Sequence, residues 1–210
     1  MGMEGRVAKW YAANTRKGIE DFRELARKIA TQLPSDAKVL EVAPGPGYFA
    51  VELAKLGSFR ISGLDISETF VEIARRNARE AKVDVAFRHG NASNMPFEND
   101  TFDFLLCRAA FKNFGEPLRA LQEMYRVLKP GGRGLIIDLR KDASQEAIGE
   151  TVDQMGLNLV NRIVTKLIFR FMLLKRAYTK KQFEQFFAHA RFRSVDIQEN
   201  LTGLDIWMEK

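Results

Sequence analysis

The sequence predicts an α/β fold with a doubly wound, mostly parallel sheet, and two observations carry this prediction. From residue 15 to residue 140, short apolar runs typical of strands alternate with amphipathic runs typical of helices. The strand runs are almost continuously apolar, as in parallel strands that are buried on both faces. Because crossovers between parallel strands are right-handed, the connecting helices would cover both faces of the sheet.

The helices are predicted from apolar residues that recur at steps of three and four. In the first, over residues 15–33, these include Phe22, Leu25 and Ile29, and Pro34 ends the run. Further helices are predicted over residues 48–56, 68–82 and 117–128. The apolar runs predict strands over residues 38–43, 59–64, 83–88, 101–107 and 134–139.

The tail after residue 140 follows a different pattern. Residues 146–176 read as one or two helices at a place where a sheet protein usually has a short loop. Residues 179–182 form a capping-box pattern that opens a helix to about residue 190. Residues 192–199 and 203–209 alternate apolar and polar side chains, which predicts a hairpin that closes the sheet with an antiparallel strand.

We expect one domain over residues 1–210, because the length suits a single core with a small appendage at most. Residues 1–34 would form a helical cap, and residues 36–140 would form the sheet core. Residues 143–190 would form a helical insertion that acts as a lid. Residues 192–210 would supply the closing strands.

The net charge of +6 and the pI near 9.5 belong mainly to one segment. Residues 157–193 hold nine Lys/Arg and one Glu, a net +8, so the rest of the chain carries −2. Asn158, Arg162, Lys166 and Arg170 are spaced by four and would form one polar stripe on a helix. The positive charge is therefore a local feature and only weak support for a nucleic-acid partner.

Cysteine and histidine usage excludes several kinds of site. Cys107 is the only cysteine, so neither an intramolecular disulfide nor a cysteine-rich zinc site can form, which fits a reducing compartment. His89 and His189 are far apart in the sequence, and no metal site is expected. The N-terminus lacks the apolar core of a signal peptide, and residues 157–174 are too polar for a membrane span. We therefore expect a cytoplasmic protein.

A glycine turn follows the first predicted strand and opens a helix. Gly45 and Gly47 let a ligand approach the backbone closely, and the helix N-terminus offers free N–H groups. Asp65 ends the next strand, where a carboxylate can accept both hydroxyl protons of a ribose. Together these residues predict a nucleoside ligand at the carboxyl edge of the sheet, the edge formed by the C-terminal ends of its parallel strands.

The same turn satisfies the dinucleotide pattern G-x-G-x-x-G/A through Gly45, Gly47 and Ala50. Glu41 argues against a dinucleotide, because a carboxylate inside the strand would repel a pyrophosphate and could anchor an ammonium group. A chain of this length also leaves no room for a separate catalytic domain. The alternative without any ligand is a tight strand–helix turn.

Five short motifs follow one another in order between residues 39 and 132. They are Val39–Gly47 (VLEVAPGPG), Gly63–Ser67 (GLDIS), Gly90–Phe97 (GNASNMPF), Phe102–Phe104 (FDF) and Arg126–Gly132 (RVLKPGG). In this order they resemble the motifs of class I S-adenosylmethionine-dependent methyltransferases of the small-molecule type. Asn113-Phe114 and the following helix also resemble the C-methyltransferases of the ubiquinone and menaquinone pathways, which are longer. The resemblance implies a Rossmann-like, seven-stranded sheet.

The resemblance also implies S-adenosylmethionine as the cofactor and S-adenosylhomocysteine as its product. Asp65 would hold the ribose, Ala43 stands where relatives usually have the first glycine, and Asn91 stands where they have Asp beside the adenine. The cofactor-binding residues implied in this way are Tyr11, Glu41, Val42, Ala43, Gly45, Gly47, Asp65, Ile66, Asn91, Ala92, Arg108 and Ala109.

The acceptor side of the site is less defined by sequence. No residue is diagnostic as a base, and the catalytic candidates are Asp138 and Tyr178. For Asp138 the functional interpretation is orientation of the acceptor, and the alternative is a capping role. Phe111 stands where relatives often carry His, which removes a titratable group. The residues expected to line the acceptor are Phe111, Phe114, Arg176 and Tyr178. The basic helix of the tail reads either as a lid over an apolar acceptor or as a dimerisation or core helix.

Three functions remain open from the sequence. The first is a methyltransferase for a small-molecule acceptor, and the second is an RNA or DNA methyltransferase, suggested by the pI. The third is a cofactor-binding protein without catalysis. We do not expect a nucleic-acid partner, because the chain lacks an added nucleic-acid module and the N/D-P-P-Y/F motif of base N-methyltransferases. A membrane-surface role ranks third for the basic helix, and the chain would be a monomer or a homodimer.

Overall fold

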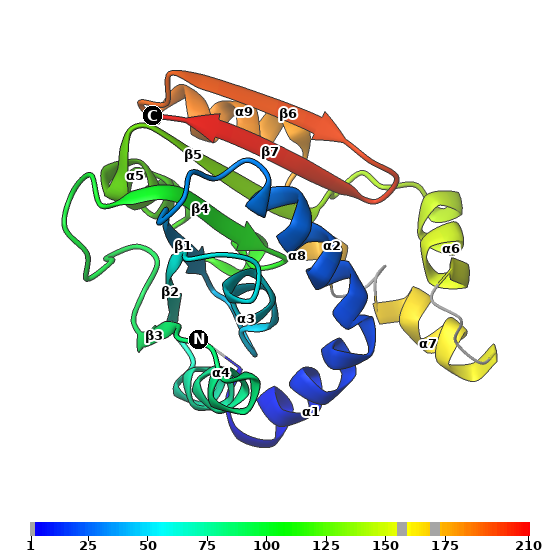
Figure 1. Cartoon of the computed structure of the whole chain (residues 1–210). Helices are drawn as coiled ribbons and strands as arrows, with labels where there is room; N and C mark the ends of the chain where they lie inside the picture. Colours follow the sequence, from blue (N-terminus) through cyan, green and yellow to red (C-terminus); the bar gives the residue numbers. More distant parts are fainter. Residues whose placement is uncertain (1–2, 155–158, 169–172) are drawn as a thin grey trace.

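The computed structural model describes residues 3–154, 159–168 and 173–210, and within them one seven-stranded sheet runs through the molecule (Figure 1). Its strands are β1 (Lys38–Val42), β2 (Arg60–Asp65), β3 (Ala86–His89), β4 (Phe102–Arg108), β5 (Leu128–Leu139), β6 (Ser194–Glu199) and β7 (Gly203–Glu209). The α-helices are α1 (Gly5–Thr15), α2 (Ile19–Ala30), α3 (Tyr48–Ala54), α4 (Glu68–Ala81), α5 (Pro117–Val127), α6 (Gln145–Gln154), α7 (Leu159–Ile168), α8 (Leu174–Arg176) and α9 (Lys180–Ala188). The described residues also include the short 3-10 helices η1 (Arg16–Gly18) and η2 (Phe111–Asn113).

The strand order is β3-β2-β1-β4-β5-β7-β6. Strands β1 to β5 pair in parallel, and β7 is antiparallel to both β5 and β6. This confirms the predicted fold class, including the antiparallel C-terminal strand. The strand order reverses between β1 and β4, and in open α/β sheets ligands bind beside that point, at the carboxyl ends of the strands.

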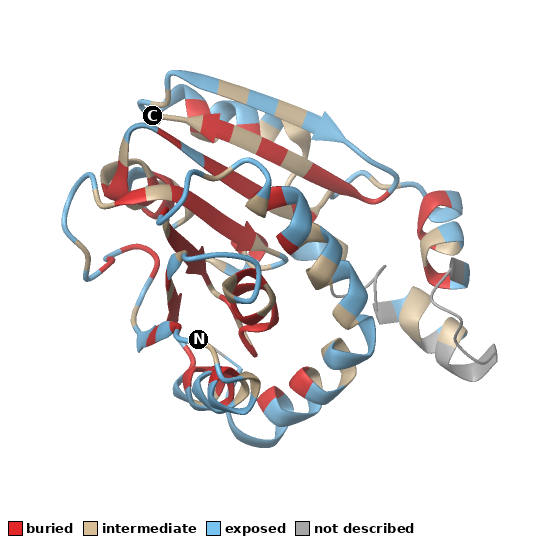
Figure 2. Cartoon of the chain, viewed as in Figure 1, coloured by how far each residue is buried: buried red, intermediate tan, exposed pale blue. Residues whose placement is uncertain are grey.

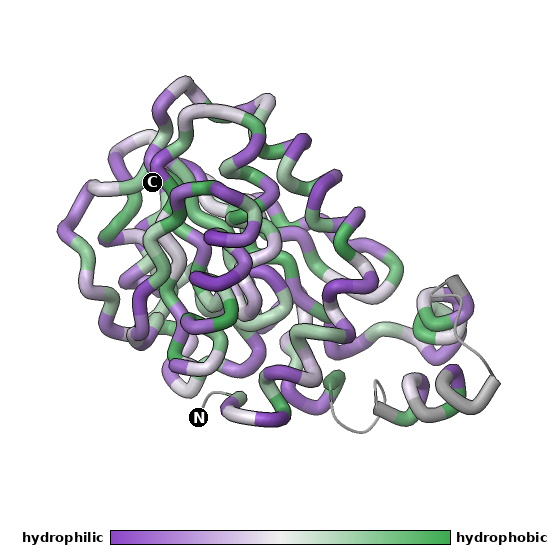
Figure 3. Tube along the Cα trace, turned by 60° about the horizontal axis from the view of Figure 1, so that its bottom comes forward, coloured by the Kyte–Doolittle hydropathy of each residue, from purple (hydrophilic) through white to green (hydrophobic). Residues whose placement is uncertain are grey.

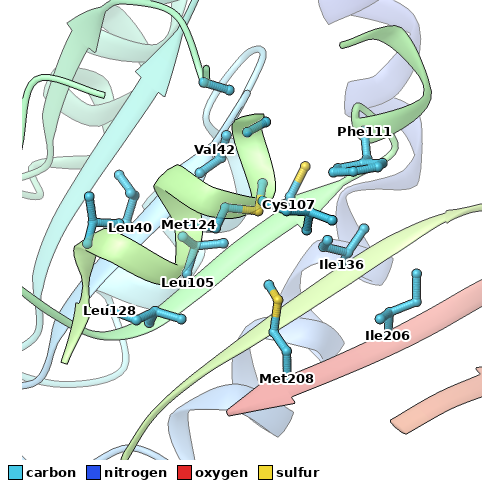
Figure 4. Close-up of a cluster of buried hydrophobic side chains, with 14 of the residues drawn as sticks. Leu40, Val42, Leu105, Cys107, Phe111, Met124, Leu128, Ile136, Ile206 and Met208 are labelled. Atoms are coloured by element: carbon cyan, nitrogen blue, oxygen red, sulfur yellow. The ribbon is translucent and has the colours of Figure 1, made fainter. Parts of the chain in front are cut away.

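Helices cover the sheet on both faces, because successive side chains of a buried strand point to opposite sides. Val39 and Leu106 pack in a core with α2, α3 and α4. Leu40 and Leu105 pack in a second core with α5 and α9. Figure 2 shows the central strands as an almost continuous buried layer, and Figure 4 shows the second core around Cys107.

The N-terminal region differs from the sequence prediction. One helix was expected over residues 15–33, but α2 begins at Ile19 after η1, and α1 precedes both. Helix α1 buries Ala8 and Ala12 against Phe70 and Ile73 of α4. Because alanines carry most of this contact, the apolar periodicity of α1 is weak in the sequence.

Strand β5 is longer than predicted, because it begins at Leu128 and not near residue 134. Leu128 pairs with Phe102 and Arg133 pairs with Phe104, so the residues between them form a bulge. The Pro130-Gly131-Gly132 run, which follows the helix predicted over residues 117–128, therefore lies inside the strand. The capping box at Thr179 is confirmed and opens α9.

Helices α6 and α7 contact each other and extend beyond one end of the sheet (Figures 1 and 3). Ion pairs join Arg162 and Lys166 of α7 to Asp153 of α6, both with N–O distances of 3.2 Å. The other two members of the predicted polar stripe, Asn158 and Arg170, lie outside the described residues. None of the helices in the described ranges is long and apolar enough to cross a membrane.

Candidate cofactor and acceptor site

The turn after β1 adopts backbone angles that glycine favours. Ala43, Gly45 and Gly47 all have positive φ, at 55°, 54° and 75°. Ala43 holds this conformation with a side chain, which costs about 1 kcal/mol or more and gives a physical reason for glycine at this place in relatives. A Cβ on Gly47 would come within 2.6 Å of Phe87, whereas one on Gly45 would meet nothing within 4 Å. Gly47 is therefore required by packing, and Gly45 leaves its backbone open to a ligand.

Asp65 joins the turns that follow β1 and β2. Its two carboxylate oxygens accept hydrogen bonds from the backbone N–H of Gly45 and that of Ser67, both at 2.9 Å. Burial raises the pKa of Asp65 above its ordinary value, although both hydrogen bonds oppose the shift. The carboxylate thus lies where β2 ends, at the place from which it could accept ribose hydroxyl protons.

Glu41 is a buried carboxyl group close to the same turn. Its side chain is only 3% exposed and accepts one hydrogen bond, from the backbone N–H of Ala50 at 3.1 Å. Burial raises the pKa of Glu41 to about 8, and the positive charge of Arg108 opposes this shift. The Arg108 guanidinium stacks on the Phe22 ring, 4.1 Å from its centroid. A buried carboxyl group with so few donors is suited to a cationic group such as an ammonium.

The predicted adenine side consists of the loops after β2 and β3. His89 Nε2 lies 3.1 Å from the carbonyl oxygen of Ile66 and so ties these two loops together. Asn91 Oδ1 accepts a hydrogen bond from the backbone N–H of Ser93 at 3.0 Å, which fixes a local turn. Ile66 is 44% exposed, so the loop after Asp65 presents an apolar surface that a base could cover.

Tyr11 lies on α1, which reaches across to α4. Its ring packs edge-on against Phe70, with centroids 5.8 Å apart. Helix α1 is also fastened to α3, because the Tyr48 hydroxyl donates to the carbonyl oxygen of Ala12 at 2.9 Å. The structure therefore gives Tyr11 a packing role, and its contact with the cofactor stays a prediction.

The segment before α1 supplies a contact that the sequence did not suggest. The Glu4 carboxylate accepts hydrogen bonds from the backbone N–H groups of Glu68 and Thr69 and thus caps α4. The Ser67 hydroxyl donates to the carbonyl oxygen of Met3 at 2.6 Å. Because the partners are about 64 positions apart and no local pattern connects them, sequence reasoning could not find this contact.

The loop after β4 is held by a buried ion pair. Lys112 Nζ lies 2.6 Å from Asp138 Oδ1, and the two side chains are 6% and 1% exposed. Asp138 Oδ2 also accepts from the backbone N–H of Lys112, and Lys112 Nζ donates to the carbonyl oxygen of Ala109. Asp138 is thus occupied in holding this loop, and its role in orienting an acceptor stays a prediction. Lys112 was missed, because a lysine in a loop usually lies in solvent.

An aromatic cluster lies beneath the same loop. Phe111 is fully buried and contacts the rings of Phe114, Tyr178, Phe183 and Phe186, with centroid distances of 5.2–6.3 Å. Tyr178 and Phe114 are partly exposed, so they form the outer side of the cluster. Burial raises the pKa of the Tyr178 phenol, and the charge of Asp138 adds to this effect.

The described elements bring most of the predicted residues to the carboxyl edge of the sheet. The turns after β1, β2 and β4 lie at this edge. Tyr178 lies there too, because its backbone forms an isolated β-bridge with Arg140, just after β5. Arg176 is exposed on α8, two residues before Tyr178. A surface hollow lined by Asp103, Lys129 and other residues lies at the opposite end of β4 and β5, so it is not part of this site.

The strand order, the open glycine turn and the carboxylates of Glu41 and Asp65 are the features that the resemblance to class I S-adenosylmethionine-dependent methyltransferases implies. The residues present fit the cofactor, because one buried carboxyl group suits an ammonium and the other can accept the hydroxyl protons of a ribose. When bound, the cofactor supplies an electrophilic methyl group on a sulfonium.

Comparisons with known proteins agree with this resemblance over part of the chain. Residues 40–136 match the family described as a methyltransferase domain. The chain is 35% identical over 111 residues to a demethylmenaquinone methyltransferase of Deinococcus radiodurans, a match that covers 52% of this chain and 46% of the relative. It is 29% identical over 179 residues to a demethylmenaquinone methyltransferase of Lactococcus lactis, covering 79% and 69%. The chain thus spans about half the length of the first of these relatives.

The fold agrees with a crystal structure assigned to the S-adenosylmethionine-dependent methyltransferases, from Methanococcus maripaludis. The two share a TM-score of 0.77 over 100% of this chain and 97% of the other, at 20% sequence identity. At that identity the likeness concerns the fold alone. S-adenosylmethionine is the cofactor that the sequence motifs and the matched methyltransferase domain imply.

Proposed function

We propose that this chain transfers the methyl group of S-adenosylmethionine to a small-molecule acceptor and releases S-adenosylhomocysteine. The observation that carries the proposal is the pair of buried carboxyl groups around an open glycine turn. Asp65 is 5% exposed and Glu41 is 3% exposed, yet among the described residues their hydrogen-bond donors are backbone N–H groups and not cationic side chains. Burying two acids without such partners is costly unless a ligand uses them.

An apolar, aromatic or quinone-like acceptor is the class we favour. The partly exposed Phe114 and Tyr178 would offer ring faces to a flat molecule. The relatives named demethylmenaquinone methyltransferases point in the same direction. Transfer by in-line displacement needs alignment and exclusion of water more than acid–base chemistry, which agrees with a buried aromatic cluster at the transfer edge.

A nucleic-acid acceptor is less well supported. Several cations of the basic tail are already paired, among them Arg162 and Lys166 with Asp153, and Arg193 with Glu209. Phosphate binding would have to displace these carboxylates. We further propose a cytoplasmic protein, in agreement with its single buried cysteine, and a monomer or homodimer.

Calorimetric titration with S-adenosylmethionine tests the cofactor assignment. We expect the wild type to bind and Asp65→Asn to lose at least about tenfold in affinity, because the amide cannot accept from both ribose hydroxyls. Asp103→Asn, at the opposite edge of the sheet, serves as the matched control and should bind as the wild type does. A wild type that does not bind, or an Asp65→Asn variant with unchanged affinity, would contradict the proposal.

A further inference from the structure

The Lys112–Asp138 ion pair is not explained by the cofactor contacts described above. It lies at the carboxyl ends of β4 and β5, and its two charged groups are almost completely buried, with their side chains 6% and 1% exposed. The Asp138 carboxylate also accepts from the backbone N–H groups of Lys112 and Leu139, at 2.9 and 2.8 Å. Such a pair is expensive to bury and is often no more stable than a well-packed apolar pair, so its place in the fold calls for another reason.

The pair is attached to the residues that border the predicted cofactor. Lys112 Nζ donates to the carbonyl oxygen of Ala109 at 2.7 Å. Ala109 has a positive φ of 57°, a strained conformation for a residue with a side chain, and its N–H donates to the carbonyl oxygen of Ile137 at 2.7 Å. The ion pair and the end of β5 together hold this strained residue directly after Arg108.

The charges of the pair also act on Cys107, near the carboxyl end of β4. The Cys107 thiol is fully buried at the end of β4, and burial raises its pKa. The negative charges of Asp138 and Glu41 raise that pKa further, whereas the positive charge of Lys112 lowers it. The Cys107 thiol therefore lies close enough to the ion pair and to Glu41, the predicted ammonium anchor, for the charges of both to shift its pKa.

We propose that Lys112 and Asp138 are positioning residues whose opposite charges neutralise each other beside the transfer site, so that the pair anchors the loop after β4 without changing the relative binding of the cationic cofactor and its neutral-sulfur product. This inference rests on the proposed function. S-adenosylmethionine carries a positive sulfonium, and S-adenosylhomocysteine carries an uncharged thioether at the same place. While the pair is intact, its two charges largely cancel at the sulfur. When one member is removed, the remaining buried charge acts on the sulfonium and hardly on the thioether.

The two single variants should therefore change the preference in opposite directions. Asp138→Asn leaves a buried ammonium and should weaken binding of S-adenosylmethionine relative to S-adenosylhomocysteine by about fivefold or more. Lys112→Met leaves a carboxylate that keeps its two backbone donors, and it should strengthen the same relative binding by a similar factor. The double variant Lys112→Met/Asp138→Asn should return the ratio close to that of the wild type.

The experiment is calorimetric titration of the wild type and the three variants with both nucleosides, at one pH and one ionic strength. Lys129→Met and Asp103→Asn remove the pair at the other ends of β4 and β5, and these controls should leave the ratio unchanged. If Asp138→Asn does not fold, Lys112→Met and the double variant still give the sign of the effect and its reversal.

The outcomes separate this inference from the proposed function. A merely structural ion pair would weaken both nucleosides by the same factor, or shift both single variants in the same direction, and either result would overturn the inference alone. A wild type that binds neither nucleoside would overturn the proposed function, and the inference with it. Opposite shifts that cancel in the double variant support the inference.

Discussion

Strands β4 and β5 carry a Lys–Asp ion pair at each end, and the two pairs share a geometry but not a setting. Lys112–Asp138 at the carboxyl edge and Lys129–Asp103 at the amino edge both have N–O distances of 2.6 Å. The first pair is almost completely buried, whereas the side chains of the second are 37% and 25% exposed. Since the N–O distances are equal, the difference in burial should determine how much the loss of each pair lowers the free energy of unfolding.

The two edges also differ in how their acids ionise. At the carboxyl edge, burial raises the pKa values of Glu41 and Asp65 above their ordinary values. At the amino edge, burial alone would raise the pKa of Asp103, but hydrogen bonds from Lys129 and Lys38 outweigh it and lower that pKa. The amino edge thus satisfies Asp103 internally, whereas Glu41 and Asp65 at the carboxyl edge accept only from backbone N–H groups among the described residues, as expected for the acids that we propose to meet a ligand.

The largest expected difference is in how much each ion pair contributes to the free energy of unfolding. Asp138→Asn leaves the buried Lys112 ammonium without its partner, and we expect a loss of about 3–5 kcal/mol in the free energy of unfolding. Asp103→Asn breaks a partly exposed pair and should cost less than about 1 kcal/mol. Urea unfolding of both variants measures these values. Similar losses in the two variants would remove the distinction between the edges.

A pair of glycines offers the next test, because both have positive φ but different neighbours. Gly47 at the carboxyl edge has φ 75°, and Gly131 at the amino edge has φ 76°. Gly131→Ala meets nothing within 4 Å, so it should cost only about 1 kcal/mol of backbone strain. Gly47→Ala adds collisions with Phe87 and Ala74, and we expect a loss of about 2–4 kcal/mol in total. Chemical denaturation at one temperature compares them, and equal losses would show that strain alone matters.

The sequence predicted the parts of this molecule that depend on neighbours along the chain. Strand and helix alternation follows from local periodicity, and the doubly wound arrangement with helices on both faces follows from the handedness of crossovers. The glycine turn and Asp65 were found because a tight strand–helix turn and a strand-end acid need particular residues at fixed spacing. These features could be recognised without knowing what lies across the fold.

The remaining parts depend on contacts between distant segments. Lys112 meets Asp138 across 26 positions, and Glu4 caps α4 across about 64 positions. Neither contact leaves a periodic trace, because Lys112 and Glu4 taken alone have the character of ordinary surface residues. Helix α1 was missed for a different reason, since small alanines make its contact with α4 and give little periodic signal.

The third prediction concerns the pH dependence of stability at the carboxyl edge. The pKa of Glu41 is about 8 in the folded protein and 4.5 as its ordinary value. Between these values the folded state binds the proton and the unfolded state releases it, so stability falls as pH rises from about 4.5 to about 8. We expect the wild type to lose about 2 kcal/mol or more over this range relative to Glu41→Gln, in urea titrations at each pH. Parallel curves for the two proteins would contradict the raised pKa.

The smallest expected effect has the opposite sign and belongs to the amino edge. The pKa of Asp103 is lowered, so the unfolded state takes up the proton first when the solution is acidified. Its contribution is therefore fully present above the ordinary value of 3.8 and is lost as pH falls through the lower folded value. Because the pair is partly open to solvent, this loss should stay below about 1 kcal/mol, and added salt should reduce it. Unfolding of the wild type and Asp103→Asn between pH 5 and pH 3, with and without salt, measures the difference. We propose buried acids without cationic partners only at the carboxyl edge of the sheet. If the stability contributed by Asp103 instead fell as pH rose, burial would determine the pKa values of the acids at both edges, and the proposed difference between the edges would be wrong.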